Sequence, residues 1–332
     1  MRRREFITLL GGAAAAAWPP VARAQQPDRM RRIGVVIGGG ENDLERKTYL
    51  AGFTHGLAEL GWTDGRNLRM DVRWAAGNVD LMRTFAKELV DRRPEMILAA
   101  TTPATAAVQR ETRTIPIVFV SVSDPVGEGF VERLPRPGGN LTGFISEEAS
   151  MAAKWLELLT EIAPTVKRAA IMFNPDTAPG GGSYYLPAFE AAARSLKVAA
   201  IAAPVHSDAE IEMVITSLGR ELGGGVVVST DAFMIVHRAP VILLAARYNV
   251  PAVYQTSVFA RDGGLLSYGP DRVDIFRRSA SYVDRILRGE KPADLPVQLP
   301  VKFEMALNAK TAKALGLAVP LSIRLRADEV IE

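Results

Sequence analysis

The fold is decided by residues 31–74, whose sequence is RRIGVVIGGGENDLERKTYLAGFTHGLAELGWTDGRNLRMDVRW. The apolar run 33–37 has the length of a buried strand, and 68–74 is suited to a second strand. Between them, one helix face is marked by apolar side chains at helical spacing, namely Tyr49, Phe53, Leu57 and Leu60, and Gly61 ends the helix. This strand–helix–strand order predicts a parallel sheet covered by helices.

The same alternation continues on both sides of a turn-rich break at 135–143. Before the break we expect helices over 79–92 and from 104, and strands over 96–100 and 117–120. After it we expect helices over 147–162, 185–196 and from 207, and strands over 168–173, 198–203 and 226–229. The last third adds a helix over 236–248, strands at 252–254 and 265–268, a helix over 273–289, an extended segment over 296–307 and a helix near 311. The sequence therefore predicts an α/β protein with two doubly wound parallel-sheet lobes.

Part of the first lobe recurs in the second. Tyr49 and Phe53 have counterparts in Tyr185 and Phe189, at the same offset that relates the strands starting at Arg32 and Arg168. A shared strand, loop length and helix face indicates an internal duplication. Segments near 268–270 and 291–292 would carry the chain between the lobes, as a hinge.

The first 24 residues differ in kind from the rest. Three arginines at positions 2–4 precede an apolar run over 6–17, and Ala22-Arg23-Ala24 offers small residues at a cleavage point. The run is shorter than the about 20 apolar residues of a membrane-spanning helix. We expect a signal peptide cleaved near Ala24/Gln25, and Arg3-Arg4-Glu5-Phe6-Ile7 fits the twin-arginine pattern, with the general export route as the alternative. The predicted location is the periplasm.

The charge balance and the absence of cysteine argue against several classes of binding partner and modification. The 332 residues include 40 Lys or Arg and 37 Asp or Glu, and residues 1–24 hold four Arg and one Glu, so the remainder is neutral with 36 of each sign. No concentrated basic run remains to favour nucleic acid or an anionic membrane. The chain has no cysteine, so neither a disulfide nor a lipid-modified cysteine is expected.

Enzyme motifs are incomplete. Gly38-Gly39-Gly40 follows the first strand, but Asp43 stands where a dinucleotide-binding motif needs glycine. No G-x-S-x-G motif is present, and the three histidines, at 55, 206 and 237, are far apart. We therefore expect no catalytic residue, cofactor or metal. The alternative is an enzyme that uses Asp124 and Asp231 as an acid–base pair.

Polar residues follow several predicted strands, where open α/β sheets bind ligands and helix N-termini offer N–H donors. The hydroxyls could hold a carboxylate, and the acids could accept an ammonium or hydroxyl group. The predicted ligand-binding residues are Gly39, Glu41, Thr101, Thr102, Thr105, Ser123, Asp124, Asn174, Tyr184, Thr230 and Asp231. The alternatives are local: helix capping by the 101–105 segment and by Asp231, and a turn cap by Asp124. Tyr184 is favoured over Tyr185, which the repeat places in its own lobe.

Together these residues resemble the ABC transporter substrate-binding family that includes the bacterial tryptophan/tyrosine-type binding proteins, with the type I periplasmic-binding fold. The resemblance spans about 32–317 and depends on motifs in a fixed order: Thr102-Pro103-Ala104, Ile115-Pro116-Ile117-Val118-Phe119, Ser123-Asp124-Pro125-Val126-Gly127, Pro137-Gly138-Gly139-Asn140-Leu141-Thr142-Gly143 and Lys291-Pro292-Ala293-Asp294-Leu295-Pro296-Val297. At matching positions it implies that the 102–104 loop, Asp124, Asn174 and Asp231 line the cleft. The loop 38–43 differs from that of the tryptophan-type proteins, and this difference argues against an aromatic amino acid as the ligand of this chain.

The resemblance implies a first lobe of 31–143 plus 269–292 and a second of 144–268 plus 293–332. It also implies a monomeric binding component of an ABC-type importer, which captures a small polar or aromatic organic solute, such as an amino acid or a carboxylate, and delivers it to an inner-membrane permease. The alternative is a sensory module that presents its ligand to a membrane receptor.

Overall fold

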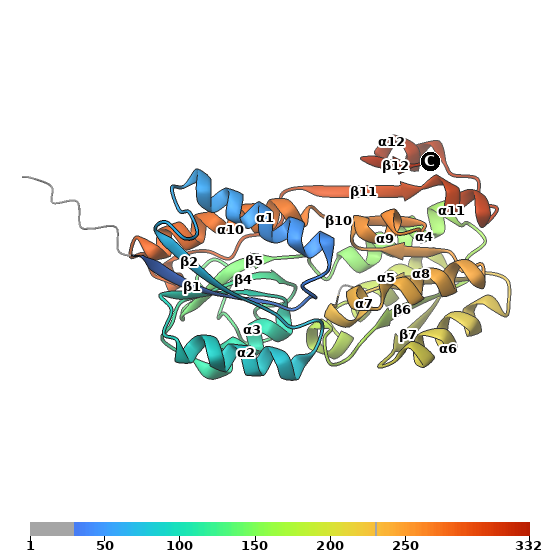
Figure 1. Cartoon of the computed structure of the whole chain (residues 1–332). Helices are drawn as coiled ribbons and strands as arrows, with labels where there is room; N and C mark the ends of the chain where they lie inside the picture. The colour runs from blue at the N-terminus through green and yellow to red at the C-terminus, as the bar shows by residue number, and fades with distance from the viewer. Residues whose placement is uncertain (1–29, 230) are drawn as a thin grey trace, which may run out of the picture. The chain divides into compact units, whose positions relative to one another are not determined.

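The computed structural model describes residues 30–229 and 231–332 (Figure 1). The predicted signal peptide and Thr230 lie outside this part of the chain. The first sheet has the order β2-β1-β3-β4-β5, and all its strands are parallel. They are β1 (Arg31–Ile37), β2 (Leu68–Trp74), β3 (Met96–Ala100), β4 (Ile117–Val122) and β5 (Leu141–Ile145).

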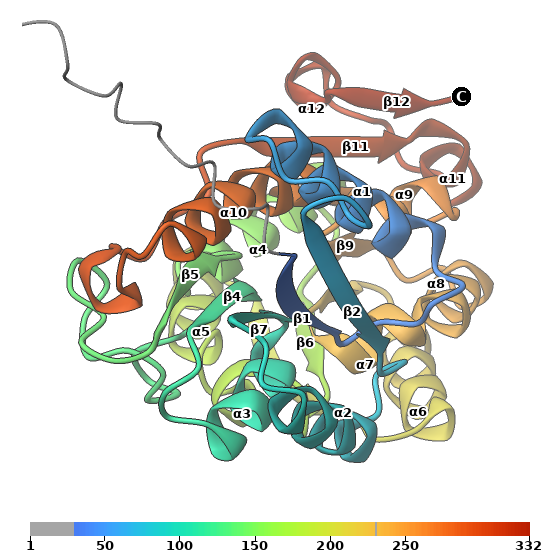
Figure 2. The ribbon, with the colours of Figure 1, turned by 60° about the vertical axis from the view of Figure 1, so that its left-hand side comes forward.

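Helices cover both faces of the first sheet (Figures 1 and 2). One face packs against α1 (Leu44–Glu59) and α10 (Arg272–Leu287), and the other against α2 (Val79–Asp91) and α3 (Thr102–Glu111). Because both faces are covered, the central strands are apolar on both sides, and every residue of β3 and β4 is buried.

The second sheet has the order β12-β11-β10-β9-β8-β6-β7. Its strands are β6 (Arg168–Phe173), β7 (Ala199–Pro204), β8 (Gly224–Val228), β9 (Ala252–Tyr254), β10 (Leu266–Pro270), β11 (Phe303–Asn308) and β12 (Glu329–Ile331). The β10–β11 pair is antiparallel, and the other pairs are parallel. Two doubly wound sheets confirm the predicted fold class.

Two layers of helices also cover the second sheet. One face packs against α4 (Met151–Ile162) and α5 (Leu186–Leu196), and the other against α6 (Asp208–Gly219), α7 (Ala232–Val236), α8 (Arg238–Arg247) and α9 (Ser257–Arg261). Short 3₁₀ turns, η1 (Pro179–Gly182) and η2 (Pro292–Asp294), and the helices α11 (Ala309–Ala314) and α12 (Leu321–Arg326) complete the described chain.

Two predicted helices have different limits in the structure. The helix expected over 236–248 corresponds to α8, which begins at Arg238, and a separate short helix that was not predicted, α7, precedes it; His237 leaves the helical conformation between the two. The helix expected from 147 begins only at Met151. The four preceding residues form a connection in which Glu147 is completely buried, so this segment contributes to the site described below.

The chain crosses between the sheets more than once. Although α10 directly follows β10 of the second sheet, it packs against α1 over the first sheet. Leu295 and Val297 also belong to the cores around the first sheet, and Gln298 forms a β-bridge with Phe144. The lobe limits given above stay a prediction; we propose that these contacts extend the first lobe to about 298.

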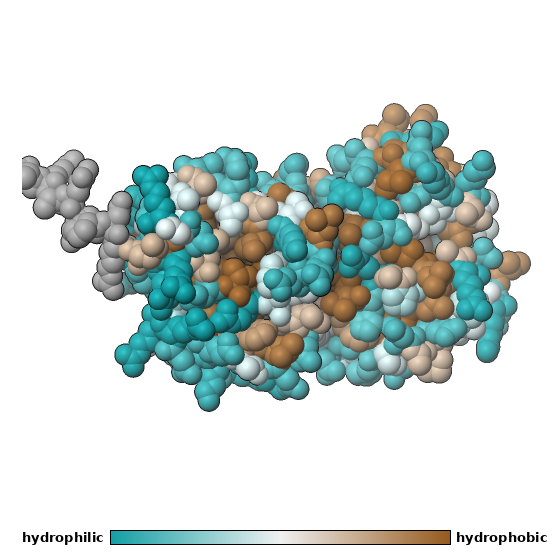
Figure 3. All heavy atoms as spheres, in the orientation of Figure 1, coloured by the Kyte–Doolittle hydropathy of each residue, from teal (hydrophilic) through white to brown (hydrophobic). Residues whose placement is uncertain are grey.

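On the face drawn in Figure 3, hydrophilic residues predominate and apolar side chains form small separate groups. Within 30–229 and 231–332, no helix has both the length and the apolar character needed to span a membrane.

Gly143 permits close pairing of β4 and β5, because a Cβ there would lie 2.0 Å from the Phe119 carbonyl oxygen. We expect Gly143→Ala to lower the free energy of unfolding by about 3 kcal/mol, through overpacking of the sheet. Gly139→Ala is the matched control, since no atom lies within 4 Å of a Cβ at that position. Urea unfolding of both variants tests this, and equal stabilities would contradict it.

Candidate functional site

The carboxyl ends of strands from both sheets meet around an inner cavity. The first sheet and its helices contribute Arg46, Thr101, Ser121, Ser123 and Arg272, and the second contributes Thr177 and Asp231. The cavity holds about 20 Å³, which is room for about one water molecule. A larger molecule therefore requires the walls of the inner cavity to move apart.

Two strand ends at the inner cavity have strained backbones. Thr101, after β3, has φ 104° and ψ 155°, and Ser121, near the end of β4, has φ 59°. Such conformations cost roughly 1–3 kcal/mol each and often occur at functional sites. The hydroxyls of both residues are buried without a hydrogen-bond partner among the described residues. These strained positions therefore present polar groups that the surrounding chain does not satisfy.

The glycine run after β1 has a packing role. A Cβ at Gly38 would lie 2.6 Å from Thr101 Oγ1, and one at Gly39 would lie 2.9 Å from Arg46 Cγ. The backbone of this loop therefore makes close contact with two residues that line the inner cavity. Of the two predicted residues here, Gly39 is buried against Arg46, whereas Glu41 is exposed.

The predicted threonines of α3 differ in their surroundings. Thr101 and Thr102 line the inner cavity. Thr105 is buried, and its hydroxyl donates to the Thr101 carbonyl at 2.9 Å. Thr105 therefore stabilises the start of the helix, and its hydroxyl is already paired.

The β4 loop contains one residue at the cavity and one in a turn. Ser123 is buried, and its Oγ lies 3.1 Å from Ser146 Oγ and 3.0 Å from the Tyr185 hydroxyl. Asp124 instead accepts a hydrogen bond from the Gly127 amide at 2.8 Å. This is the turn cap that the sequence offered as the alternative for Asp124.

Asp231 is buried at the inner cavity and surrounded by donors. It caps α7 by accepting from the Met234 amide at 2.8 Å, and it also accepts from the Asn174 amide at 3.1 Å and the Thr177 hydroxyl at 3.0 Å. Burial raises the pKa of Asp231 to about 6, although the Met234, Asn174 and Thr177 hydrogen bonds favour the charged form. The Asn174 side chain donates to the Val205 carbonyl at 2.9 Å, so Asp231 and Asn174 mainly brace the strand ends of the second sheet.

Of the two neighbouring tyrosines, Tyr185 packs in the core of the second sheet, as the repeat predicted, but its hydroxyl also reaches the inner cavity. Tyr185 is 1% exposed, and its hydroxyl bridges to the other sheet by lying within 3.1 Å of both Ser123 Oγ and Glu147 Oε1. Tyr184 is half-buried, and its hydroxyl lies 3.5 Å from the Glu147 carbonyl. Tyr185, which the repeat places in its own lobe, is thus the tyrosine that contacts the residues of the inner cavity.

Two arginines that were not predicted as ligand-binding residues also line the inner cavity. Arg46 lies in the first turn of α1 and Arg272 begins α10, and each is 4% exposed. Cations near a helix N-terminus are disfavoured by the helix dipole. An arginine placed shortly after an N-cap aspartate, as after Asp43 and Asp271, is therefore unusual, and this feature of the sequence could have identified both residues.

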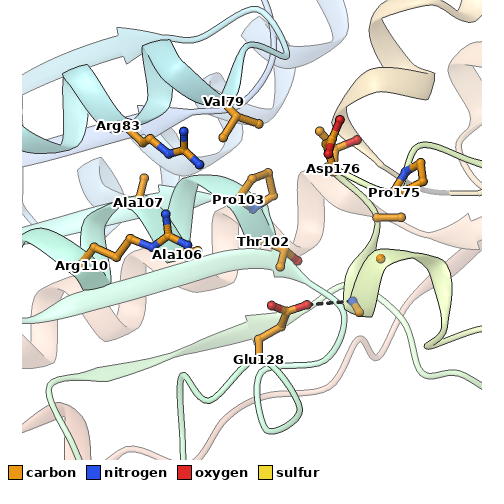
Figure 4. A pocket seen from close by; sticks show the side chains of 14 residues that line it. Val79, Arg83, Thr102, Pro103, Ala106, Ala107, Arg110, Glu128, Pro175 and Asp176 are labelled. Atoms are coloured by element: carbon orange, nitrogen blue, oxygen red, sulfur yellow. Dashed lines mark hydrogen bonds between the residues drawn. The ribbon is translucent and has the colours of Figure 1, made fainter. Parts of the chain in front are cut away.

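An outer cavity of about 250 Å³ adjoins the inner one, and the two share Thr102, Pro103 and Thr177. Figure 4 shows Arg83 and Arg110 on its first-lobe side and Asp176 on the other. The Gly180 amide donates across it to Glu128 Oε1 at 2.8 Å. In the described part of the chain, no group of three or more His, Asp or Glu side chains is placed to hold a metal.

Comparisons with known proteins agree with this architecture. A family described as "ABC transporter substrate binding protein" matches residues 41–331. A tyrosine-binding protein from Clostridioides difficile strain R20291 is 26% identical over 280 residues, covering 84% of this chain and 78% of that protein.

Two solved structures are informative because they differ in state. The ABC domain from Streptococcus pneumoniae in complex with L-Trp is 25% identical, with a TM-score of 0.83, and covers 91% of this chain and 100% of that chain. A ligand-free, open substrate-binding protein from Clostridium difficile is also 25% identical and covers 91% of this chain and 99% of that chain, but with a TM-score of 0.68.

The raised pKa of Asp231 predicts a pH dependence of stability. The folded protein retains the Asp231 proton up to about pH 6, whereas the unfolded chain releases it near about pH 3.9. The contribution of Asp231 to the free energy of unfolding should therefore fall by about 2 kcal/mol between pH 4 and 7. Urea unfolding of the wild type and Asp231→Asn at both pH values measures this. A wild-type advantage that grows with pH would refute the assignment.

Proposed function

Because the chain belongs to the family of ABC transporter substrate-binding proteins, we propose that it captures a small organic solute at the inner cavity and delivers it to a membrane permease. Membership of this family of binding proteins confirms the prediction that the chain is not an enzyme. We further propose that it acts as a monomer, with one solute site between the two sheets.

One observation carries the proposal: both sheets line the same small cavity, and the first sheet and its helices direct buried polar groups without partners toward it. The hydroxyls of Thr101 and Ser121 and the Nε atoms of Arg46 and Arg272 have no hydrogen-bond partner among the described residues. Unsatisfied buried polar groups are costly, so they favour a site where a ligand supplies the partners. The higher TM-score to the L-Trp complex than to the open structure supports a closed arrangement of the lobes.

The ligands of similar proteins support a small organic molecule as the solute. The similar proteins bind tyrosine or tryptophan, and we propose a polar or aromatic solute with a carboxylate group for this chain. Hydrogen bonds from Thr101, Ser121 and the arginines suit such a group, because all four can donate.

We also propose export to the periplasm with cleavage near Ala24/Gln25, by the twin-arginine route. The support comes from the sequence of residues 1–24, which lie outside the described part of the chain. A periplasmic location would place the solute site where an inner-membrane permease can receive the closed protein.

The first test is binding without turnover. Isothermal titration calorimetry of the exported protein with amino acids, aromatic acids and small carboxylates should find a solute with a micromolar or lower Kd, recovered chemically unchanged after incubation. Small-angle scattering with and without that solute should show a change in the radius of gyration. Steady conversion of the bound solute, or no binding by any of these compounds, would refute the proposed function.

A second test concerns an ion pair between the lobes. Arg238, which begins α8, donates to Asp43 Oδ2 at 3.2 Å and to Asp262 Oδ2 at 2.8 Å. Asp43→Ser keeps a side chain that can cap α1 but removes the contact with Arg238, so closure should weaken and solute affinity should fall about two- to fivefold. Asp262→Ser, which breaks only the contact within the second lobe, is the control. Calorimetry measures both, and equal affinities of the two variants would contradict a role in closure.

A further inference from the structure

Arg46 is a buried cation whose side chain forms no ion pair or hydrogen bond with the described residues. It is 4% exposed and lines the inner cavity, and its Nε has no hydrogen-bond partner among the described residues. The only aromatic contact found for it there is the Tyr49 ring, whose centroid lies 5.4 Å from the guanidinium carbon. A buried charge is costly unless it is paired. The missing partner is therefore expected to be an anion that enters the cavity.

The position of Arg46 on its helix adds to that cost. It lies in the first turn of α1, close to the positive end of the helix dipole. Arg272 has the same relation to α10, which packs beside α1 (Figure 2). Two helix N-termini and two buried guanidinium groups therefore make the same end of the cavity favourable for negative charge.

Two buried acids at the cavity or beside it, Asp231 and Glu147, are already engaged. Asp231 accepts hydrogen bonds from Met234, Asn174 and Thr177, as described above. Glu147 is completely buried, and its two oxygens contact the Tyr185 hydroxyl at 3.1 Å and Arg272 Nη2 at 3.4 Å.

Glu45, the neighbour of Arg46, lies on the wall of a different cavity. Burial raises the pKa of Glu45, although the charges of Arg46 and Arg272 act to lower it, and its Oε2 has no hydrogen-bond partner among the described residues. The polar groups left without partners at the inner cavity are thus the two guanidinium Nε atoms and the hydroxyls of Thr101 and Ser121. All of them can donate, and Asp231, the one acid among the described residues that line this cavity, already accepts three hydrogen bonds.

We propose that Arg46 binds the carboxylate of the solute, and that the solute is an organic acid without an ammonium group. This inference rests on the proposed function and names its substrate class. Gly39 supports it sterically, because its missing Cβ leaves the space in which the Arg46 side chain lies over the loop.

The test compares matched ligands on the wild type by calorimetry. One set is 3-(4-hydroxyphenyl)propanoate, its amide and L-tyrosine, which differ only in the carboxylate or the ammonium group. A second set is 4-methylpentanoate, its amide and L-leucine. We expect the acid of at least one set to bind about 10- to 100-fold more tightly than its amide and its amino acid. Tighter binding of either amino acid or of either amide than of the matching acid would overturn the inference.

A comparison of Arg46→Met with Lys47→Met distinguishes the loss of a charge at the cavity from the loss of a charge on the outer face of α1. Lys47 is exposed in the same helical turn, so its loss changes the charge near the dipole without changing the cavity. Arg46→Met should lose about 10- to 100-fold in affinity for the acid, and Lys47→Met should bind it as the wild type does. Unchanged affinity of Arg46→Met for the acid would overturn the role of Arg46.

Thermal unfolding provides a second readout that does not depend on binding. Because the buried Arg46 side chain forms no ion pair or hydrogen bond with the described residues, ligand-free Arg46→Met should unfold at the same temperature as the wild type or higher, and it should lose the increase in Tm that the acid produces in the wild type. A lower Tm of the ligand-free variant would identify Arg46 as a structural residue and overturn the inference. Binding of amino acids but not acids would defeat this inference alone, whereas no binding by any compound would defeat the proposed function.

Discussion

The buried ion pair between Glu147 and Arg272 joins two of the segments by which the chain passes between its sheets. Glu147 follows β5 of the first sheet, and Arg272 follows β10 of the second, yet their side chains lie 3.4 Å apart with almost no exposure to solvent. Removal of one member of such a pair typically costs about 3–5 kcal/mol. The Tyr185 hydroxyl adds a bond to Glu147 from a third segment. The relative placement of the strand ends around the inner cavity depends on this group.

The sequence predicted the architecture well because both sheets are buried on both faces. Continuous apolar strands such as β3 and β4 differ clearly from the amphipathic helices between them. Predicted helix limits differ from the observed ones where tertiary contacts compete with local preference. The segment before Met151 has helix-forming residues, but Glu147 forms an ion pair with Arg272 and a hydrogen bond with the Tyr185 hydroxyl instead. At His237, stacking on Phe233 and a hydrogen bond to Asp208 accompany the break between α7 and α8.

The site was predictable only in part, because position after a strand does not reveal where a side chain points. The inner cavity is lined by four of the predicted residues, Thr101, Thr102, Ser123 and Asp231. Asp124 instead caps a local turn by accepting from the Gly127 amide. Arg46 lies well past the end of β1, and its route to the cavity depends on the close contact with Gly39. Such a contact is set by the packing of loop and helix in three dimensions, which the residue pattern alone does not encode.

The strained backbone at Thr101 and Ser121 sets the conditions for engineering this protein. Both positions would be relieved by glycine, which adopts positive φ at little cost, but glycine would also remove the hydroxyls. A selection for heat tolerance and a selection for ligand capture would therefore choose opposite residues at the ends of β3 and β4. Substitutions that raise the thermal stability of the protein without loss of binding would therefore lie away from these two strand ends.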